Sequence, residues 1–252
     1  MKAVMLAAGV GERLGESEDL PKCLLEIGGE TLLQRHFDIL RHCGVDELTI
    51  GVGYRAELIE AAIAAVPELT VRTVINPSYD RGSLVTFWSL REHFAGGGDV
   101  LLMDADVLYD HRLMQRLTSS AHRDCFLLDR DFDAASEEPV KLCVRGGRLV
   151  EFRKRVSVAT DFCGESVGFF RFSESTARAL VDAAARYIHD DRLDEPYEEA
   201  IRDVLLADGA RFGYEDVTGL PWIEIDFPED VIRARDEVLP RLHVTQQQLI
   251  QQ

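Results

Sequence analysis

Short apolar runs alternate along the first half of the chain with segments whose apolar residues recur every three or four positions. The runs have the length of buried β-strands and lie at residues 4–7, 48–52, 71–75 and 100–103. The segments with helical spacing lie between them, at residues 32–40, 57–66 and 83–90. This alternation predicts an α/β fold with a doubly wound, mostly parallel sheet. Because ligands of such sheets bind beyond the carboxyl ends of the strands, we expect a site in the loops that follow them.

The second half departs from simple alternation. Residues 140–144 and 148–152 flank Gly146 and Gly147, which predicts a small β-hairpin that projects from the main sheet. Residues 164–168 are expected to precede a strand. Further strands are expected at 125–128, 169–172, 212–216 and 222–226, and helices at 173–188, from 195 and at 228–238. Residues 1–240 are predicted to form a single domain whose halves meet near residue 125. Residues 241–252 show no core pattern and are predicted to be a flexible tail.

Composition narrows the possible partners. The formal net charge of −17 argues against binding to nucleic acid or to an anionic membrane surface, since both need a basic face. No apolar run is long enough to predict insertion into a membrane. The five cysteines are an odd number without paired spacing, so we expect reduced thiols in a cytoplasmic protein. An anionic ligand would have to be met by local cations and a metal ion.

The loop after the first strand offers such cations. Gly9 and Gly11 allow a sharp turn and expose backbone N–H groups, and Arg13 and Lys22 follow them. The spacing fits neither a Rossmann dinucleotide fingerprint, which needs a helix opening at the glycines, nor a Walker A loop, which needs G-K-[ST]. The pattern therefore indicates a polyanion site of another kind.

Acidic residues end two of the predicted strands. Asp104 and Asp106 are two positions apart after a buried run, so both carboxylates can face the same side, and carboxylates are suitable ligands for a divalent cation. Capping of the next helix is the alternative, with Asp110 as a further candidate. Alternation also places Trp222, Glu224 and Asp226 on one side of a late strand, where Asp226 can instead be read as belonging to the N-cap of the final helix.

The sequence LAAGVGERL at residues 6–14, followed by PKCLL at 21–25, resembles the signature of the sugar-phosphate-type nucleotidyltransferases. Within that superfamily the short chain, with LLMDADVLYD at 101–110 and the late WIEID at 222–226, is most similar to the phosphocholine and phosphonate cytidylyltransferases. The resemblance implies a Rossmann-like fold of the nucleotide-diphospho-sugar transferase type. It also implies a Mg²⁺-dependent reaction of CTP with a small phosphomonoester or phosphonate, giving a CMP-linked product and pyrophosphate.

The resemblance also implies roles for individual residues, with a nucleotide half up to about residue 125 and an acceptor half after it. Lys22 and Arg13 would stabilise the charge of the nucleotide phosphates, and Asp106 and Asp226 would hold Mg²⁺. Asp104 would lie near the ribose. The remaining nucleotide-binding positions would be Leu6, Ala7, Ala8, Gly9, Gly11, Gly82 and Ser83. Ser83 can equally be the N-cap of the following helix.

Seven residues of the second half are candidates for acceptor binding: Lys141, Lys154, Glu165, Tyr197, Glu198, Trp222 and Glu224. Lys154 belongs to a basic triplet that can simply be solvated, and Glu198 lies at the start of a helix, where acids are favoured without any ligand. Trp222 and Tyr197 can bracket a quaternary ammonium by cation–π contact, whereas a primary ammonium, as in 2-aminoethylphosphonate, prefers carboxylates. The sequence leaves the two acceptors open.

Two other functions remain compatible with the sequence. One is a uridylyl-, guanylyl- or thymidylyltransferase acting on a sugar 1-phosphate, and the other is a non-catalytic nucleotide-binding domain. A homodimer is a possible assembly.

Overall fold

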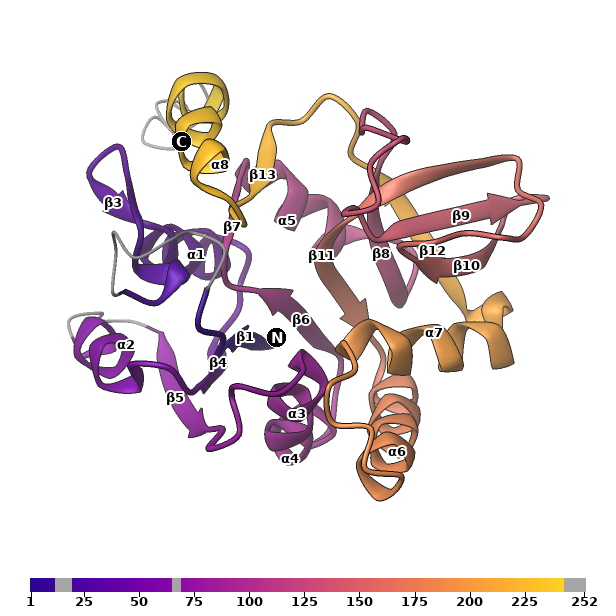
Figure 1. Cartoon of the computed structure of the whole chain (residues 1–252), viewed down its shortest axis with the longest axis horizontal. Helices are drawn as coiled ribbons and strands as arrows, with labels where there is room; N and C mark the ends of the chain where they lie inside the picture. The colour runs from indigo at the N-terminus through magenta and orange to yellow at the C-terminus, as the bar shows by residue number, and fades with distance from the viewer. Residues whose placement is uncertain (12–19, 65–68, 243–252) are drawn as a thin grey trace.

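The computed structural model describes residues 1–11, 20–64 and 69–242. Its centre is a nine-stranded sheet in which seven strands follow the order β10-β9-β11-β6-β1-β4-β5, while β8 pairs with β11 and β12 pairs with β8. Figure 1 shows this sheet running through the middle of the molecule, with the parallel strands on one side and the β9–β10 hairpin on the other. The predicted fold class is therefore confirmed.

The first half of the chain builds the parallel part. β1 (Lys2–Ala7) lies between β4 (Glu47–Val52) and β6 (Val100–Asp104), and β5 (Thr70–Ile75) forms the edge beside β4. The crossovers carry the helices α1 (Leu32–His42), α2 (Ala56–Ile63), α3 (Ser83–Ser89) and α4 (Arg91–Phe94). The Thr31 side chain caps α1 by accepting a hydrogen bond from the Gln34 N–H at 3.1 Å. All four expected strands and the expected helices are present.

The second half adds antiparallel strands. β11 (Phe162–Phe172) pairs with β6, with β8 (Asp124–Asp129) and with β9 (Lys141–Arg145). β9 and β10 (Arg148–Arg153) form the expected hairpin across Gly146 and Gly147, and β12 (Phe212–Asp216) runs parallel to β8. The strand expected at 169–172 begins earlier than expected, because residues 164–168 also belong to β11, and Glu165 lies opposite Lys141 of β9. Pairing with β8 and β9 extends the strand through these residues.

Two helical layers cover the sheet. On one face, α3, α4, α6 (Glu174–His189) and α7 (Tyr197–Ala207) pack on a core rich in phenylalanine. On the other face lie α1, α2 and α5 (His111–Ser119), the last capped by the Asp110 side chain. Alternation along β6 sends Val100 and Leu102 to the first face and Leu101 and Met103 to the second. By the same alternation, the Asp104 side chain lies on the first face, where α7 packs.

A third, smaller core lies beyond the carboxyl ends of the parallel strands. It joins the two-stranded pairs β2–β3 (Glu26–Ile27 and Glu30–Thr31) and β7–β13 (Val107–Tyr109 and Trp222–Glu224) to α8 (Pro228–Arg233). A π-helical turn, Ala234–Val238, continues α8, as the expected final helix required. Short 3₁₀ turns at Lys22–Leu24 and Gly209–Arg211 complete the described elements.

Two of the expectations fall partly outside the described residues, namely the position of Arg13 and the tail beyond residue 242. Among the helices that are described, none combines the length and the apolar content needed to cross a membrane.

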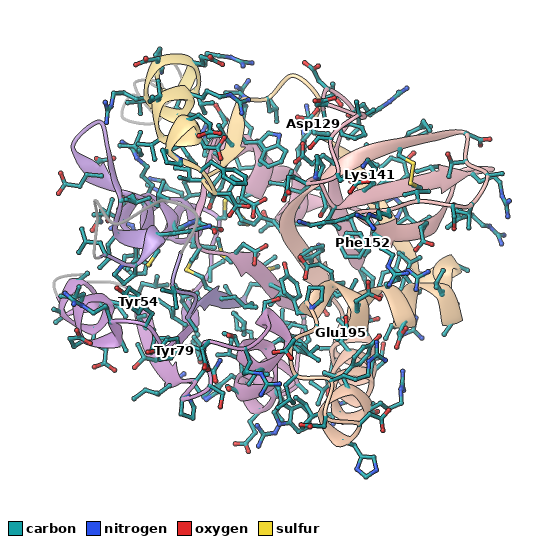
Figure 2. All side chains as sticks on the ribbon, viewed as in Figure 1. Tyr54, Tyr79, Asp129, Lys141, Phe152 and Glu195 are labelled. Carbon is teal, nitrogen blue, oxygen red and sulfur yellow. A yellow bond between two sulfur atoms is a disulfide. The ribbon has the colours of Figure 1, made fainter. Side chains whose placement is uncertain are left out.

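The expectation that all the cysteines are reduced is wrong for two of them. Cys143 of β9 and Cys163 of β11 are directly opposite in the strand register and form a disulfide, visible as the yellow bond in Figure 2. Cys23, Cys43 and Cys125 are free. Spacing along the chain could not reveal this pair, because only the pairing of β9 with β11 brings the two residues together.

We expect reduction of this disulfide to destabilise the protein. The bond closes a loop with a sequence separation of 20, for which the chain-entropy model gives a stabilisation of about 3 kcal/mol. Urea unfolding with and without dithiothreitol should show a decrease of that order in the free energy of unfolding. The double variant Cys143→Ala/Cys163→Ala is the control and should not respond to the reductant. An equal response of both proteins would contradict the prediction.

Candidate active site

The carboxyl ends of β1 and β6 meet at one edge of the sheet, because Leu6 and Asp104 are partners in the parallel register. The glycine loop follows β1 directly, and the Asp104-Ala105-Asp106 turn follows β6. A cleft lies between them, which we call the glycine-loop cleft. It is lined by Leu6, Ala7, Gly9, Val10, Gly11, Lys22, Cys23, Tyr79, Asp80, Arg81, Ala105, Asp106 and Asp226.

Lys22 lies in this cleft with its ammonium between two carboxylates. Its Nζ is 3.0 Å from Asp106 Oδ2 and 2.5 Å from Asp226 Oδ1. Gly11 adopts a φ of +70°, and a Cβ there would lie 3.1 Å from Lys22 Cγ, so the glycine leaves space for the lysine side chain. Burial disfavours the charged lysine, but the two carboxylates outweigh it and raise the pKa of Lys22. The lysine is therefore held as a cation.

Three carboxylates meet beside this ammonium. Asp106, Glu224 and Asp226 each offer an oxygen, and these oxygens all lie within 4.8 Å of one another. The strand pairing of β13 with β7 brings the late segment to this place, and the Ile225 N–H donates to the Asp106 carbonyl at 2.9 Å. Hard oxygen donors at this separation fit a divalent cation such as Mg²⁺. Sequence reasoning had assigned Glu224 to the acceptor, although its spacing of two from Asp226 already placed both carboxylates on one side.

Asp226 is oriented by the helix that follows it. The Asp230 carboxylate accepts hydrogen bonds from the backbone N–H groups of Asp226 (3.1 Å) and Phe227 (2.9 Å). The N-cap of α8 is Phe227, so Asp226 is not the cap itself and its side chain faces Lys22. The helix start thus fixes the backbone that carries this carboxylate.

Asp104 has different surroundings from Asp106. Its Oδ2 accepts a hydrogen bond of 2.8 Å from the Tyr197 hydroxyl, and it lies over Gly168, where a Cβ would approach that oxygen to 2.4 Å. Burial and the charges of Glu198, Asp106 and Glu224 raise the pKa of Asp104 well above its usual range. The two aspartates of the D-A-D motif therefore face the same region but have separate partners.

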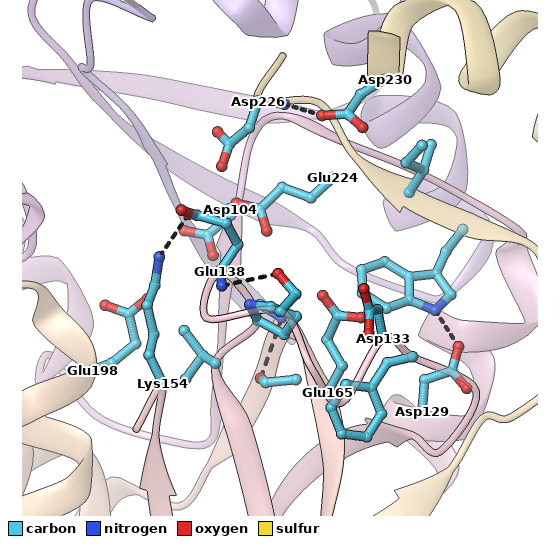
Figure 3. A pocket seen from close by; sticks show the side chains of 18 of the residues that line it. Asp104, Asp129, Asp133, Glu138, Lys154, Glu165, Glu198, Glu224, Asp226 and Asp230 are labelled. Atoms are coloured by element: carbon cyan, nitrogen blue, oxygen red, sulfur yellow. Dashed lines mark hydrogen bonds and ion pairs between the residues drawn. The ribbon is translucent and has the colours of Figure 1, made fainter. Parts of the chain in front are cut away.

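A larger cavity of about 720 Å³ opens on the other side of Asp226 (Figure 3), and we call it the acidic cavity. Its described lining contains ten carboxylates: Asp104, Asp129, Asp131, Asp133, Glu138, Glu165, Glu198, Glu224, Asp226 and Asp230. Two cations, Lys154 and Arg233, accompany them, and both are paired, with Glu138 at 3.4 Å and with Asp230 at 3.3 Å. The cavity therefore carries a strong excess of potential negative charge.

The two predicted lysines of the hairpin are placed differently. Lys154 lines the acidic cavity beside Glu198, as Figure 3 shows. The Lys141 ammonium instead donates to the carbonyls of Ser136 (2.9 Å) and Lys154 (3.1 Å), and Lys141 does not belong to the described lining. Its neighbours make it a support of the 131–139 segment rather than a ligand-facing group.

Four other acceptor candidates lie together in the acidic cavity. Glu165 and Glu198 line it, and a Glu198 Oε2 that is fully buried has no hydrogen-bond partner. Burial raises the pKa of Glu198 to about 7. Trp222 also lines the cavity and donates its indole N–H to Asp129 Oδ2 at 2.7 Å. Tyr197 also lines the cavity, but it is only 3% exposed and its hydroxyl is bound to Asp104, so little of its ring is open to a ligand.

Gly82 and Ser83 link the nucleotide side to α7. Gly82 is the N-cap of α3, so the expectation that Ser83 caps this helix is wrong. The Gly82 N–H donates to the Leu193 carbonyl at 3.0 Å, and Ser83 Oγ accepts from the Tyr197 N–H at 3.1 Å. Ser83 lines a smaller hollow together with Leu6, Ala8 and Gly9, which joins the cleft to Asp104 and Glu198. Of the two residues, only Ser83 belongs to the lining.

Among the lining residues that sequence reasoning missed, three stand out. Asp129 is the last residue of β8 and comes directly after an apolar run, the same signal that identified the D-A-D motif. Tyr79 and Arg81 line the glycine-loop cleft from the segment between β5 and α3, and Arg81 is paired with Asp194 at 2.6 Å. Arg13, the second predicted cation of the glycine loop, lies outside the described residues.

Comparison with known proteins extends these observations. A family model described as a MobA-like NTP transferase domain matches residues 3–158. The chain is 31% identical over 243 residues to a bifunctional IPC transferase and DIPP synthase of Rubrobacter xylanophilus, with 94% of this chain and 52% of that protein covered. It is 27% identical over 242 residues to the CMP-5'-(3-aminopropyl)phosphonate synthase of Streptomyces rubellomurinus, with 93% and 38% covered. The chain thus spans about half or less of the length of these two relatives.

Among solved structures, the inositol-1-phosphate CTP transferase from T. maritima superposes with a TM-score of 0.73 at 20% identity, covering 94% of this chain and 97% of that one. At that identity the likeness shows the fold, and it agrees with the sheet described above. The family model begins in β1, ends beyond β10 and covers more than half of the chain. The chain therefore belongs to the MobA-like NTP transferase family, as its glycine loop and P-K motif predicted.

Proposed function

We propose that this protein is a cytidylyltransferase that transfers CMP from CTP to a small phosphomonoester or phosphonate. The observation that carries the proposal is the arrangement of Lys22, Asp106, Glu224 and Asp226 at the glycine loop. A lysine held as a cation and a carboxylate trio are what a nucleoside triphosphate with its divalent cation requires. Two of the similar proteins are named as a CMP-5'-(3-aminopropyl)phosphonate synthase and an inositol-1-phosphate CTP transferase, and these names support cytosine as the base.

The proposed reaction needs no nucleophilic side chain. A phosphoryl or phosphonyl oxygen of the acceptor forms a bond to the α-phosphorus of CTP, while the bond to the β-phosphate oxygen breaks and pyrophosphate leaves with the electron pair. The protein accelerates this displacement by positioning the two anions and by stabilising charge. Lys22 supplies positive charge in the cleft, and the backbone around Gly9 and Gly11 holds the phosphates.

The described donor set fits Mg²⁺. Asp106, Asp226 and Glu224 would hold the ion, with Asp230 orienting the backbone of Asp226. Bound there, Mg²⁺ neutralises negative charge on the phosphates that the reaction brings together. Lys22 then provides a second, fixed positive charge, which a protein of net charge −17 needs in order to admit two anionic substrates.

The acidic cavity indicates what the far end of the acceptor carries. Its ten carboxylates face two paired cations, so a further anionic group would be repelled and a cationic group attracted. Glu165 has no described hydrogen-bond partner, and burial together with the charge of Asp129 raises its pKa to about 7. We therefore assign the distal group to an ammonium bound near Glu165 and Asp129.

A hydrogen-bonding ammonium suits this cavity better than a quaternary one. A quaternary ammonium cannot donate hydrogen bonds and is bound mainly by open aromatic faces. Of the two aromatic residues expected to contact such a group, Trp222 and Tyr197, the second is buried and its hydroxyl is bound to Asp104. Unpartnered carboxylates, in contrast, accept N–H bonds directly. An aminoalkylphosphonate or an aminoalkyl phosphate is therefore the acceptor class that we favour over phosphocholine.

Removal of the Lys22 ammonium should stop turnover without unfolding the protein. Lys22→Ala should decrease the rate of pyrophosphate release at least about a hundredfold, the usual effect of losing one preorganised charge. Asp106→Asn should do the same by removing a metal ligand. Lys2→Ala is the matched control, because Lys2 binds the His93 carbonyl at the opposite end of β1, and its rate should be normal. Normal pyrophosphate release by Lys22→Ala would refute the mechanism.

A matrix of substrates tests the base and the acceptor together. Pyrophosphate release should be fastest with CTP rather than UTP, GTP or dTTP, and with 2-aminoethylphosphonate rather than phosphocholine, inositol 1-phosphate or glucose 1-phosphate. Glu165→Gln should raise the KM for the aminated acceptor about tenfold, the effect of one lost charge-assisted hydrogen bond, and leave the KM for CTP unchanged. Glu137→Gln changes an exposed carboxylate paired with Arg155 and serves as the control. Preference for UTP with glucose 1-phosphate would refute the proposal.

Glu165 should also make the stability of the free protein depend on pH. Its folded pKa, about 7, lies above the usual value of 4.5, so between these values the folded state binds more protons than the unfolded state. The free energy of unfolding of the wild type should therefore decrease as pH rises from about 4.5 to 7 relative to Glu165→Gln. Below about pH 4.5 the difference between the two proteins should no longer depend on pH. Urea titrations at several pH values measure it, and a difference that grows towards acid pH would contradict the assignment.

A further inference from the structure

His36 is a fully buried histidine on α1 that belongs to none of the three linings described above. It is 0% exposed, and its ring packs against Tyr109 and Phe169 at centroid distances of 5.4 and 6.3 Å. A histidine on the apolar face of a helix is ordinarily a core residue, but this one makes two specific polar contacts. Nε2 lies 3.1 Å from the Ala105 carbonyl oxygen, and Nδ1 lies 3.4 Å from the Tyr109 hydroxyl.

The chemistry of the partners determines the tautomer. A carbonyl oxygen only accepts, so Nε2 carries the hydrogen and donates it to Ala105. Nδ1 of the neutral ring is then the acceptor, and the Tyr109 hydroxyl donates to it. Burial lowers the pKa of His36 to about 4, so the ring is neutral at ordinary pH. The hydrogen bond to Ala105 therefore has one direction and a permanent donor.

Ala105 is the central residue of the D-A-D motif, one position before Asp106. The next carbonyl, that of Asp106, accepts from the Ile225 N–H at 2.9 Å. Two consecutive carbonyl groups of this turn are thus bound, that of Ala105 by α1 and that of Asp106 by the segment between β13 and α8. Because Asp106 has its backbone fixed in this way, its carboxylate is directed towards Lys22 and the other two acids.

We propose that His36 is a positioning residue for the metal site: it holds the Ala105 carbonyl and thereby sets the direction of the Asp106 carboxylate. This inference rests on the proposed function, since it concerns the divalent cation assigned to Asp106, Glu224 and Asp226. The residue reaches the site only through the backbone of the D-A-D turn. Its loss should therefore weaken metal binding without changing the ligands themselves.

Binding of Mn²⁺ to the full chain, measured by electron paramagnetic resonance in the absence of substrates, tests the proposal directly. Mn²⁺ reports the same oxygen site as Mg²⁺, and Asp106→Asn identifies which bound ion belongs to it. His36→Leu removes the donor and should weaken binding of that ion about tenfold, as loss of a supporting partner of a metal ligand does. His36→Gln keeps an N–H donor on a side chain of similar reach and should stay within about threefold of the wild type.

The control is Phe37→Leu, the next residue of α1, which is 2% exposed and packs in the core on the same side of the sheet. Phe37→Leu should lower the melting temperature and leave the Mn²⁺ affinity unchanged. If His36 were only a core residue, His36→Leu would have the same two effects. Wild-type Mn²⁺ affinity in a folded His36→Leu would overturn the proposal. If His36→Leu does not fold, His36→Met decides, because its unbranched side chain fills a similar space in the core but offers no N–H donor to Ala105: weaker Mn²⁺ binding supports the proposal and unchanged binding overturns it.

The metal site and the role of His36 can be refuted separately. If wild-type protein binds no Mn²⁺ that Asp106→Asn abolishes, the proposed metal site is refuted and His36 loses its role with it. If the wild type binds the ion and His36→Leu binds it equally well, only the role of His36 is refuted.

Discussion

The close approach of Lys22 to Asp106 and Asp226 is the interaction on which the rest of the site depends. The lysine is separated from these residues by 84 and 204 positions along the chain. Without a cation, carboxylates about 4 Å apart repel each other by roughly 4 kcal/mol at an effective dielectric constant near 20. The ammonium offsets this repulsion, so it holds the end of β6 and the segment after β13 in one place. A metal ion bound to the same carboxylates would act in the same sense.

The supports of this arrangement come from every part of the fold. Asp230 at the start of α8 fixes the backbone of Asp226, and Ile225 joins the same segment to the carbonyl of Asp106. His36 reaches the D-A-D turn from α1. The third core, between α8 and the β7–β13 pair, keeps these supports together beyond the end of the parallel sheet. A site that carries so much like charge needs such rigid support, because repulsion would otherwise spread it.

Ten of the 45 acidic residues of this protein line one cavity. A net charge of −17 is unfavourable for an enzyme of anionic substrates if the charge is spread evenly. The fold places Lys22 and the glycine loop in one cleft and ten carboxylates in the lining of the acidic cavity. One molecule with an anionic and a cationic end would match this division, which is why we propose an aminated phosphonate or phosphate as the acceptor.

The fold class, the glycine loop and the D-A-D motif could all be predicted from the amino-acid sequence. These features depend on local patterns: the lengths of apolar runs, the turn glycines, and acids that directly follow buried strands. Asp129 carries the same local signal and could have been found in the same way. Tertiary contacts were needed to place Glu224 in the carboxylate trio, to bind the Lys141 ammonium to the carbonyls of Ser136 and Lys154, and to include residues 164–168 in β11. The tertiary structure likewise decided the Cys143–Cys163 disulfide and the contact of His36 with Ala105. Each of these depends on which strands and helices become neighbours. Local sequence patterns do not show which distant segments of the chain will pack together.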